Sequence, residues 1–139
     1  MPRPTILFTV AALAGTTLAA CQGKRIEECN ALIGVINDEQ QQVKPAQSQE
    51  PADFERVAER LAETARRVAD VSLTVEALRE HRDAYQALVN DIAEVMRGAA
   101  QALRDRDGKK LDAARTLERQ VGEREDELVE TINRYCAGG

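Results

Sequence analysis

The chain has 139 residues, a net charge of −5 and few aromatic side chains. This length suggests one domain, and the acidic balance argues against a protein that binds nucleic acid by neutralising phosphates. Basic residues are interspersed with acidic ones, so no polybasic patch for a membrane surface is present in the sequence. Ala, Leu, Glu and Arg dominate the second half of the chain, a composition typical of α-helices.

The first twenty residues differ from the rest of the chain. Arg3 is the only charged residue among them, and the apolar run Ile6–Ala14 follows it. A positive start, a short apolar run and then small residues before Cys21 predict a secretory signal peptide over residues 1–20 that is cleaved off. The apolar run is too short to cross a bilayer, which needs about 20 helical residues.

The sequence Leu18-Ala19-Ala20-Cys21 resembles the lipobox of bacterial lipoprotein precursors at all four positions. The resemblance covers residues 1–21. It implies that the sulfur of Cys21 carries a diacylglycerol and that residues 21–25 form a lipidated N-terminus and a short tether. Gln22, where an aspartate would retain a lipoprotein in the inner membrane, predicts the outer membrane facing the periplasm. The alternative is an ordinary signal peptide whose cleavage leaves Cys21 unmodified.

Two further cysteines, Cys29 and Cys136, are expected to form a disulfide, because export takes them to an oxidising compartment. Both also lie on apolar helix faces, so two buried free thiols are the alternative. A metal site is not expected, because the only histidine, His81, cannot complete a set of ligands.

The apolar pattern predicts an all-α bundle domain over residues 26–136, followed by a tail at 137–139. Apolar residues recur at steps of three and four throughout this region, which is the spacing of one helix face. Two segments interrupt the pattern and are predicted loops: Lys44–Pro51, with its two prolines, and Asp105–Gly108, with Gly108 suited to a left-handed conformation after a helix end.

The segment between these loops decides the number of helices. We expect a break near residues 71–73, with Thr74 as N-cap and with Leu73 and Leu78 packed together as a hydrophobic staple. The result is an antiparallel up-down four-helix bundle, in which Cys29 and Cys136 meet at one end. The alternative is three helices with one long central helix of about 50 residues.

No catalytic motif is recognisable, so we predict that the protein is not an enzyme and has no cofactor. The chain lacks the paired Glu-x-x-His motifs of di-iron bundles and a glycine-rich phosphate loop. His81 is expected in a solvated stretch, and Tyr85 and Tyr135 are expected to pack in the bundle. Arg82 occupies a core position and is expected to extend along the helix surface, or else to mark a groove. The stretch Glu118–Glu127 has one good core residue, Val121, and is expected to be loosely packed or solvent-facing.

These observations predict an envelope protein held to the membrane by lipid on Cys21, acting as a non-enzymatic interaction or structural module with a protein partner. The predicted domain is similar in outline to small Cys-bridged helical lipoproteins of Gram-negative bacteria to which no activity is assigned. A periplasmic ligand carrier or an enzyme inhibitor is the alternative. A cavity lined by Ala99, Ala102 and Ala114 would favour that alternative, whereas a close-packed core would not.

Overall fold

The computed structural model describes residues 16–44, 46 and 48–138. Most of the predicted signal peptide lies outside the described residues, as does the side chain of Cys21. The described chain forms four helices and no strand: α1 (Thr16–Gln42), α2 (Pro51–Ala69), α3 (Glu76–Arg104) and α4 (Gly108–Cys136). The expected all-α bundle of four helices is therefore confirmed, and the alternative with one long central helix is wrong.

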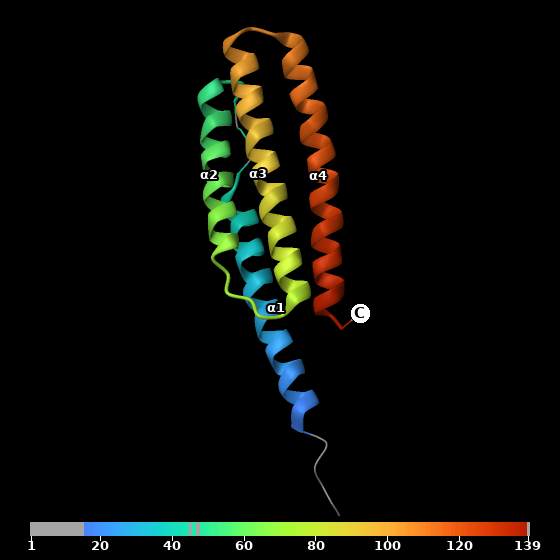
Figure 1. Cartoon of the computed structure of the whole chain (residues 1–139). Helices are drawn as coiled ribbons and strands as arrows, with labels where there is room; N and C mark the ends of the chain where they lie inside the picture. Colours follow the sequence, from blue (N-terminus) through green and yellow to red (C-terminus); the bar gives the residue numbers. More distant parts are fainter. Residues whose placement is uncertain (1–15, 45, 47, 139) are drawn as a thin grey trace, which may run out of the picture.

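The chain direction alternates from helix to helix along the bundle (Figure 1). At the lower end in that view, a disulfide joins Cys29 of α1 to Cys136, the last residue of α4, with 5.7 Å between their Cα atoms. At the upper end, Arg104 of α3 forms an ion pair with Glu55 of α2. The predicted cysteine pairing is confirmed, and the ends of the domain lie side by side.

The break between α2 and α3 lies where the sequence predicts it, but its cap is different. Val75, in extended conformation, is the N-cap residue of α3 and has no capping side chain. Glu28 of α1 caps the turn instead: its carboxylate accepts hydrogen bonds from the Thr74 hydroxyl at 2.5 Å and from the amides of Thr74 and Val75 at 2.9 Å each. Thr74 is therefore not the N-cap, because its hydroxyl is engaged by a residue 46 positions earlier.

Side chains around this turn extend the core towards the lower end. Leu73 and Leu78 are both buried, although the shifted cap removes them from the expected staple positions. The guanidinium of Arg82 has two partners: its Nη1 donates to the carbonyl oxygen of Val71 at 3.1 Å, and its Nη2 lies 2.8 Å from Oδ1 of the exposed Asp83. Arg82 thereby satisfies a backbone acceptor in the α2–α3 connection, which has no helical partner of its own.

The turn between α3 and α4 is a Schellman motif centred on Arg106. The amide of Arg106 donates to Leu103 O at 3.2 Å, and the amide of Asp107 donates to Ala102 O at 2.9 Å. Arg106 has φ = 52°, so Arg106, and not Gly108, holds the left-handed conformation. Gly108 is already the first residue of α4, because Asp107 caps that helix by accepting from the amide of Lys110 at 3.1 Å.

The start of α1 also differs from the sequence prediction. The helix begins at Thr16, so residues 21–25, expected as a short tether, are helical. Ile26, where the predicted bundle domain begins, is 52% exposed, and the core starts only at Glu28 and Cys29. From there the core continues to Ile132, next to the disulfide. All residues found to be buried in the described part of the chain therefore lie between Glu28 and Ile132.

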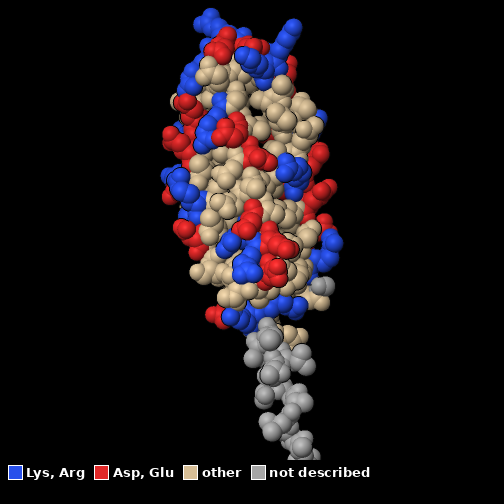
Figure 2. Space-filling model, viewed as in Figure 1, with Lys and Arg blue, Asp and Glu red and all other residues tan. Residues whose placement is uncertain are grey.

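Acidic and basic side chains alternate over the face shown in Figure 2, which carries no large patch of one sign. Within residues 16–44, 46 and 48–138, no helix is both long enough and apolar enough to cross a membrane.

Candidate functional site

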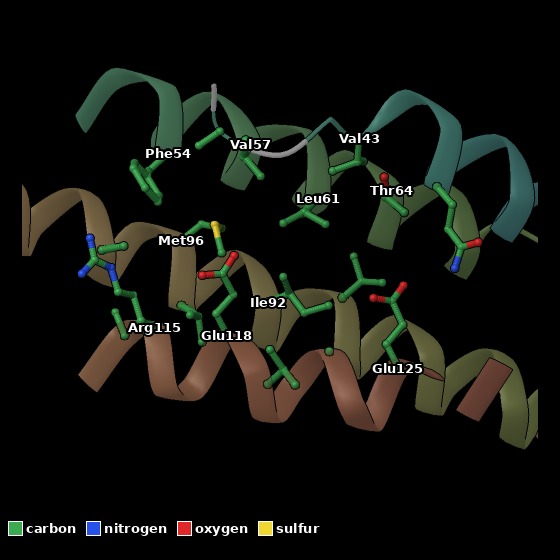
Figure 3. A pocket seen from close by; sticks show the side chains of 18 of the residues that line it. Val43, Phe54, Val57, Leu61, Thr64, Ile92, Met96, Arg115, Glu118 and Glu125 are labelled. Atoms are coloured by element: carbon green, nitrogen blue, oxygen red, sulfur yellow. The ribbon is translucent and has the colours of Figure 1, made fainter. Parts of the chain in front are cut away.

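A groove runs along the upper half of the bundle. Helix α1 ends at Gln42, well below the top of the bundle, and the segment that follows climbs to the start of α2 (Figure 1). Helix α1 therefore packs beside the other three helices in the lower half of the bundle only. The space left beside the segment is a groove of about 510 Å³ between this segment, α2, α3 and α4 (Figure 3).

The floor of the groove is apolar and recessed. Its side chains come from α2 and α3, and those labelled in Figure 3 include Phe54, Leu61, Ile92 and Met96. Leu61 is 8% exposed and Met96 is 5% exposed, so little of either side chain is open to solvent. The groove is partly open, neither an enclosed cavity nor a flat patch.

Small residues create part of this space. Ala99 of α3 and Ala114 of α4 line the groove, as expected for a cavity between helices, and Gly122 lines it further down. Ala102, the third alanine expected there, is 1% exposed but lies outside the lining. Leu117 of α4, by contrast, is 48% exposed. Of the stretch Glu118–Glu127, Val121 is the one residue buried, as the sequence predicted.

Charged side chains of α4 form one wall of the groove. Arg115, Glu118 and Glu125 follow one another along this wall in Figure 3. The guanidinium of Arg115 lies 3.4 Å from Gln49 Oε1 and 3.5 Å from Asp112 Oδ1, and both distances are at the long limit of a hydrogen bond. Arg115 is thus paired with Asp112, and none of the described ion pairs joins it to Glu118. A positive and a negative group lie on successive turns of one wall.

The lower end of the groove is closed by a polar bridge. The hydroxyl of Tyr85, on α3, donates to Glu125 Oε1, on α4, at 3.1 Å. Tyr85 is 2% exposed, which confirms the predicted packing role of its ring. Below this bridge the core is filled by larger side chains such as Leu78 and Ile132.

The segment before α2 is held in place at its far end. The hydroxyl of Ser48 donates to the carboxylate of Asp53, which also pairs with Arg56. The Ser48 hydroxyl, and after it the guanidinium of Arg56, hold the pKa of Asp53 below its ordinary value. Ser48 is thus part of a turn that fixes the entry to α2, with no histidine among its described contacts.

Near the disulfide, the ring of Tyr135 contacts the side chains of Arg25 and His81. The guanidinium carbon of Arg25 lies 5.8 Å from the centre of the Tyr135 ring, and the His81 ring meets it edge to face at 5.5 Å. His81 is half-buried here, so it does not lie in the solvated stretch that was expected. The contact fills the lower end of the bundle next to Cys136.

Other surface features do not combine into a site. The described residues contain no group of three or more His, Cys, Asp or Glu side chains that could hold a metal ion. A polar depression between α2 and α3 is lined mostly by arginines and glutamates. Three of its arginines are engaged in ion pairs: Arg56 with Asp53, Arg60 with Glu63, and Arg97 with Glu94. The groove is therefore the candidate functional site.

Sequence reasoning found Ala99 and Ala114 but not the charged wall of the groove. Leu111, Arg115, Glu118, Val121 and Glu125 recur at steps of three and four, which puts them on one face of α4. The charged residues among the apolar ones on this face were the feature of the sequence that could have indicated the charged wall. No protein-family model matches the chain, and no curated protein or solved structure matches it significantly.

Proposed function

We propose that this protein is an exported lipoprotein, anchored through Cys21, whose helical bundle binds another molecule in the groove between α2, α3 and α4. The observation that supports binding is the groove itself: about 510 Å³ of space lined by apolar side chains together with polar ones from every side. Known small-molecule sites have about 300–1,000 Å³, mostly apolar lining and a few placed polar groups. The groove favours the ligand-binding alternative over the interaction or structural module that the sequence predicted first.

The anchor and the groove lie at different ends of the molecule. Cys21 precedes the part of α1 that enters the bundle from its lower end (Figure 1). The groove is lined mainly by α2, α3 and α4 and by the segment that follows α1. An anchored protein would therefore present its groove away from the membrane surface. This arrangement suits a module that meets its ligand or partner in the periplasm.

The anchor is tested by the intact mass of the protein recovered from a membrane fraction. We expect the polypeptide that starts at Cys21 plus its lipid, and a mass equal to the bare polypeptide would refute the anchor.

The groove is tested by photo-crosslinking in producing cells. A photoreactive residue at Leu111, which lines the groove, should capture a molecule that the same residue at Arg119, outside the lining, does not capture. The captured molecule is identified by mass spectrometry. Capture of the same molecule from both positions, or only from Arg119, would refute the groove as the binding site.

A further inference from the structure

The lower end of the bundle carries a half-buried arginine whose charge is not paired. Two arginines are half-buried in the described part of the chain, Arg25 and Arg82. Arg82 donates to the carbonyl oxygen of Val71 and pairs with Asp83, whereas none of the described hydrogen bonds and ion pairs engages Arg25. Its Nε atom is buried without a partner. A buried donor in that state is rare in folded proteins and indicates that the side chain has a further binding partner.

Neighbouring side chains hold the guanidinium of Arg25 in one orientation. Its carbon atom lies 5.8 Å from the centre of the Tyr135 ring, within the range of a cation–π contact, and His81 meets the same ring edge to face. A methyl group on Gly138 would lie 3.8 Å from Nη2 of Arg25. Nε is buried, but Nη1 and Nη2 are not among the buried atoms without a partner. The guanidinium therefore presents its outer edge to solvent.

The negative groups nearest to Arg25 in the chain have other partners or other directions. Both carboxylate oxygens of Glu28, three residues on, bind the turn at Thr74 and Val75. Glu27, two residues on, faces a different side of α1. The last turn of α4 is closed by its own backbone amides. The open edge of the guanidinium is therefore suited to an anion from outside the chain, and no carboxylate beside it is free to pair with an ammonium group.

The place of Arg25 in α1 indicates which anion reaches it. Cys21, which we propose carries the lipid, lies four residues earlier in the same helix, about 6 Å along its axis. A bilayer measures about 30 Å across its hydrocarbon core and about 40–45 Å with its head groups, so each head-group layer is about 5–8 Å thick. Acyl chains on Cys21 would end at the edge of the core. Arg25, one turn further, would then lie at the level of the lipid phosphates.

We infer that Arg25 binds the phosphate of an anionic phospholipid of the phosphatidylglycerol class, and that this contact docks the lower end of the bundle on the bilayer. Two phosphate oxygens accept hydrogen bonds from Nη1 and Nη2, the paired geometry in which arginine binds phosphate. The inference rests on the proposed function, because the anchor at Cys21 brings Arg25 to the head groups. On the face shown in Figure 2, basic side chains predominate at the lower edge of the bundle.

The first experiment follows two NMR signals of the full chain, purified from membranes in a neutral detergent. The reporters are the Nε–H of Arg25, identified by its loss in Arg25→Lys, and the ring of His81, the only histidine. Short-chain phosphatidylglycerol should shift both signals and saturate, and short-chain phosphatidylcholine should bind severalfold more weakly. Inorganic phosphate should shift neither signal at the same concentrations. No response to phosphatidylglycerol, or binding of phosphatidylcholine or inorganic phosphate that is as tight, would overturn the inference.

The second experiment compares Arg25 with Lys24, an exposed neighbour of the same charge. Arg25→Gln should weaken the binding of phosphatidylglycerol, followed by the His81 signals, by at least tenfold. Attraction to an anionic surface alone is worth about fivefold for each basic residue, so Lys24→Gln should weaken binding by fivefold or less. Arg25→Lys keeps the charge but loses the paired geometry and should also bind severalfold more weakly. Equal effects of Arg25→Gln and Lys24→Gln, or full binding by Arg25→Lys, would overturn the site.

Intact mass, measured on the same samples, separates this inference from the proposed function. If the mass includes lipid and the signals of Arg25 and His81 do not respond to phosphatidylglycerol, the docking contact is wrong and the anchor stands. If the mass equals that of the bare polypeptide, the anchor is wrong, and with it the bilayer as the source of the phosphate.

Discussion

Breaking the Cys29–Cys136 disulfide should lower the stability of the domain by several kcal/mol without changing its fold. The bond joins residues 107 positions apart and therefore closes almost the whole bundle into one loop. Residues 22–139 suit the test, because without Cys21 these are the only two cysteines. The reduced protein keeps every side chain of the oxidised one, so the comparison isolates the cross-link.

The expected magnitude follows from the entropy of the unfolded chain. For a loop of this length, the chain-entropy relation gives about 16 cal/mol/K, or about 4.8 kcal/mol at 25 °C. A domain of about 119 residues has an unfolding entropy near 0.25 kcal/mol/K, so the melting temperature should fall by about 19 °C on reduction.

The assay is thermal unfolding followed by far-ultraviolet circular dichroism, with and without reductant. The variant Cys29→Ala/Cys136→Ala serves as a control that should be insensitive to reductant. The helical signal at low temperature should be the same in the oxidised and reduced proteins, because the core packing does not depend on the bond. A fall of less than about 4 °C, the equivalent of about 1 kcal/mol, would refute the loop-closure reasoning.

Four further predictions concern single residues. Leu78→Ala, which truncates a fully buried side chain, should lower the free energy of unfolding by about 2–5 kcal/mol, whereas Leu117→Ala, at a 48% exposed position, should change it by less than about 0.5 kcal/mol in denaturant titrations. Hydrogen bonds from the Thr74 hydroxyl and, next, the Val75 amide lower the pKa of Glu28 in the folded state. The contribution of the Glu28 carboxylate to the free energy of unfolding should therefore be complete at neutral pH and lost as the pH falls through that lowered pKa. The difference in melting temperature between wild type and Glu28→Gln should accordingly become smaller in acid, and a difference that does not change with pH would contradict the capping role of Glu28. Arg106→Gly should raise stability by about 1 kcal/mol by relieving the left-handed φ of 52°, and a lower melting temperature would contradict this. Cys21→Ser should yield a protein whose intact mass includes no lipid. Lipid attached to another residue of that variant would show that Cys21 is not the anchor.

Local patterns in the sequence were sufficient for the helices and the position of the breaks. Steps of three and four located the helix faces, and the Pro-rich and Gly-containing segments located two of the three turns. The predictions that were wrong concern details that depend on residues distant in the sequence. The cap of α3 comes from Glu28, 46 positions before Thr74, and no local rule could select Glu28 over Thr74. Likewise Arg106 accepts the left-handed position because Asp107 starts the next helix at once.

The groove was predictable only in part, because it depends on where α1 stops relative to the other helices. The sequence marked small residues at Ala99 and Ala114, which permit a cavity. Whether a cavity forms is decided by the height at which Gln42 ends α1 beside α2 and α3, a property of the assembled bundle. In the sequence, the charged residues Arg115 and Glu118 look like ordinary solvated charges on a helix surface. Only the positions of the neighbouring helices show that they line the groove.

The position of the disulfide also determines how the molecule responds to mechanical load. A pull on the N-terminal end of α1 enters the bundle through the residues that precede Cys29. At Cys29 the tension divides, because the covalent bond passes it directly to the last turn of α4. Helix α1 therefore cannot be peeled away from the other helices one turn at a time, and two helices must shear together. Reduction would remove this load sharing and convert the same pull into stepwise unzipping of α1.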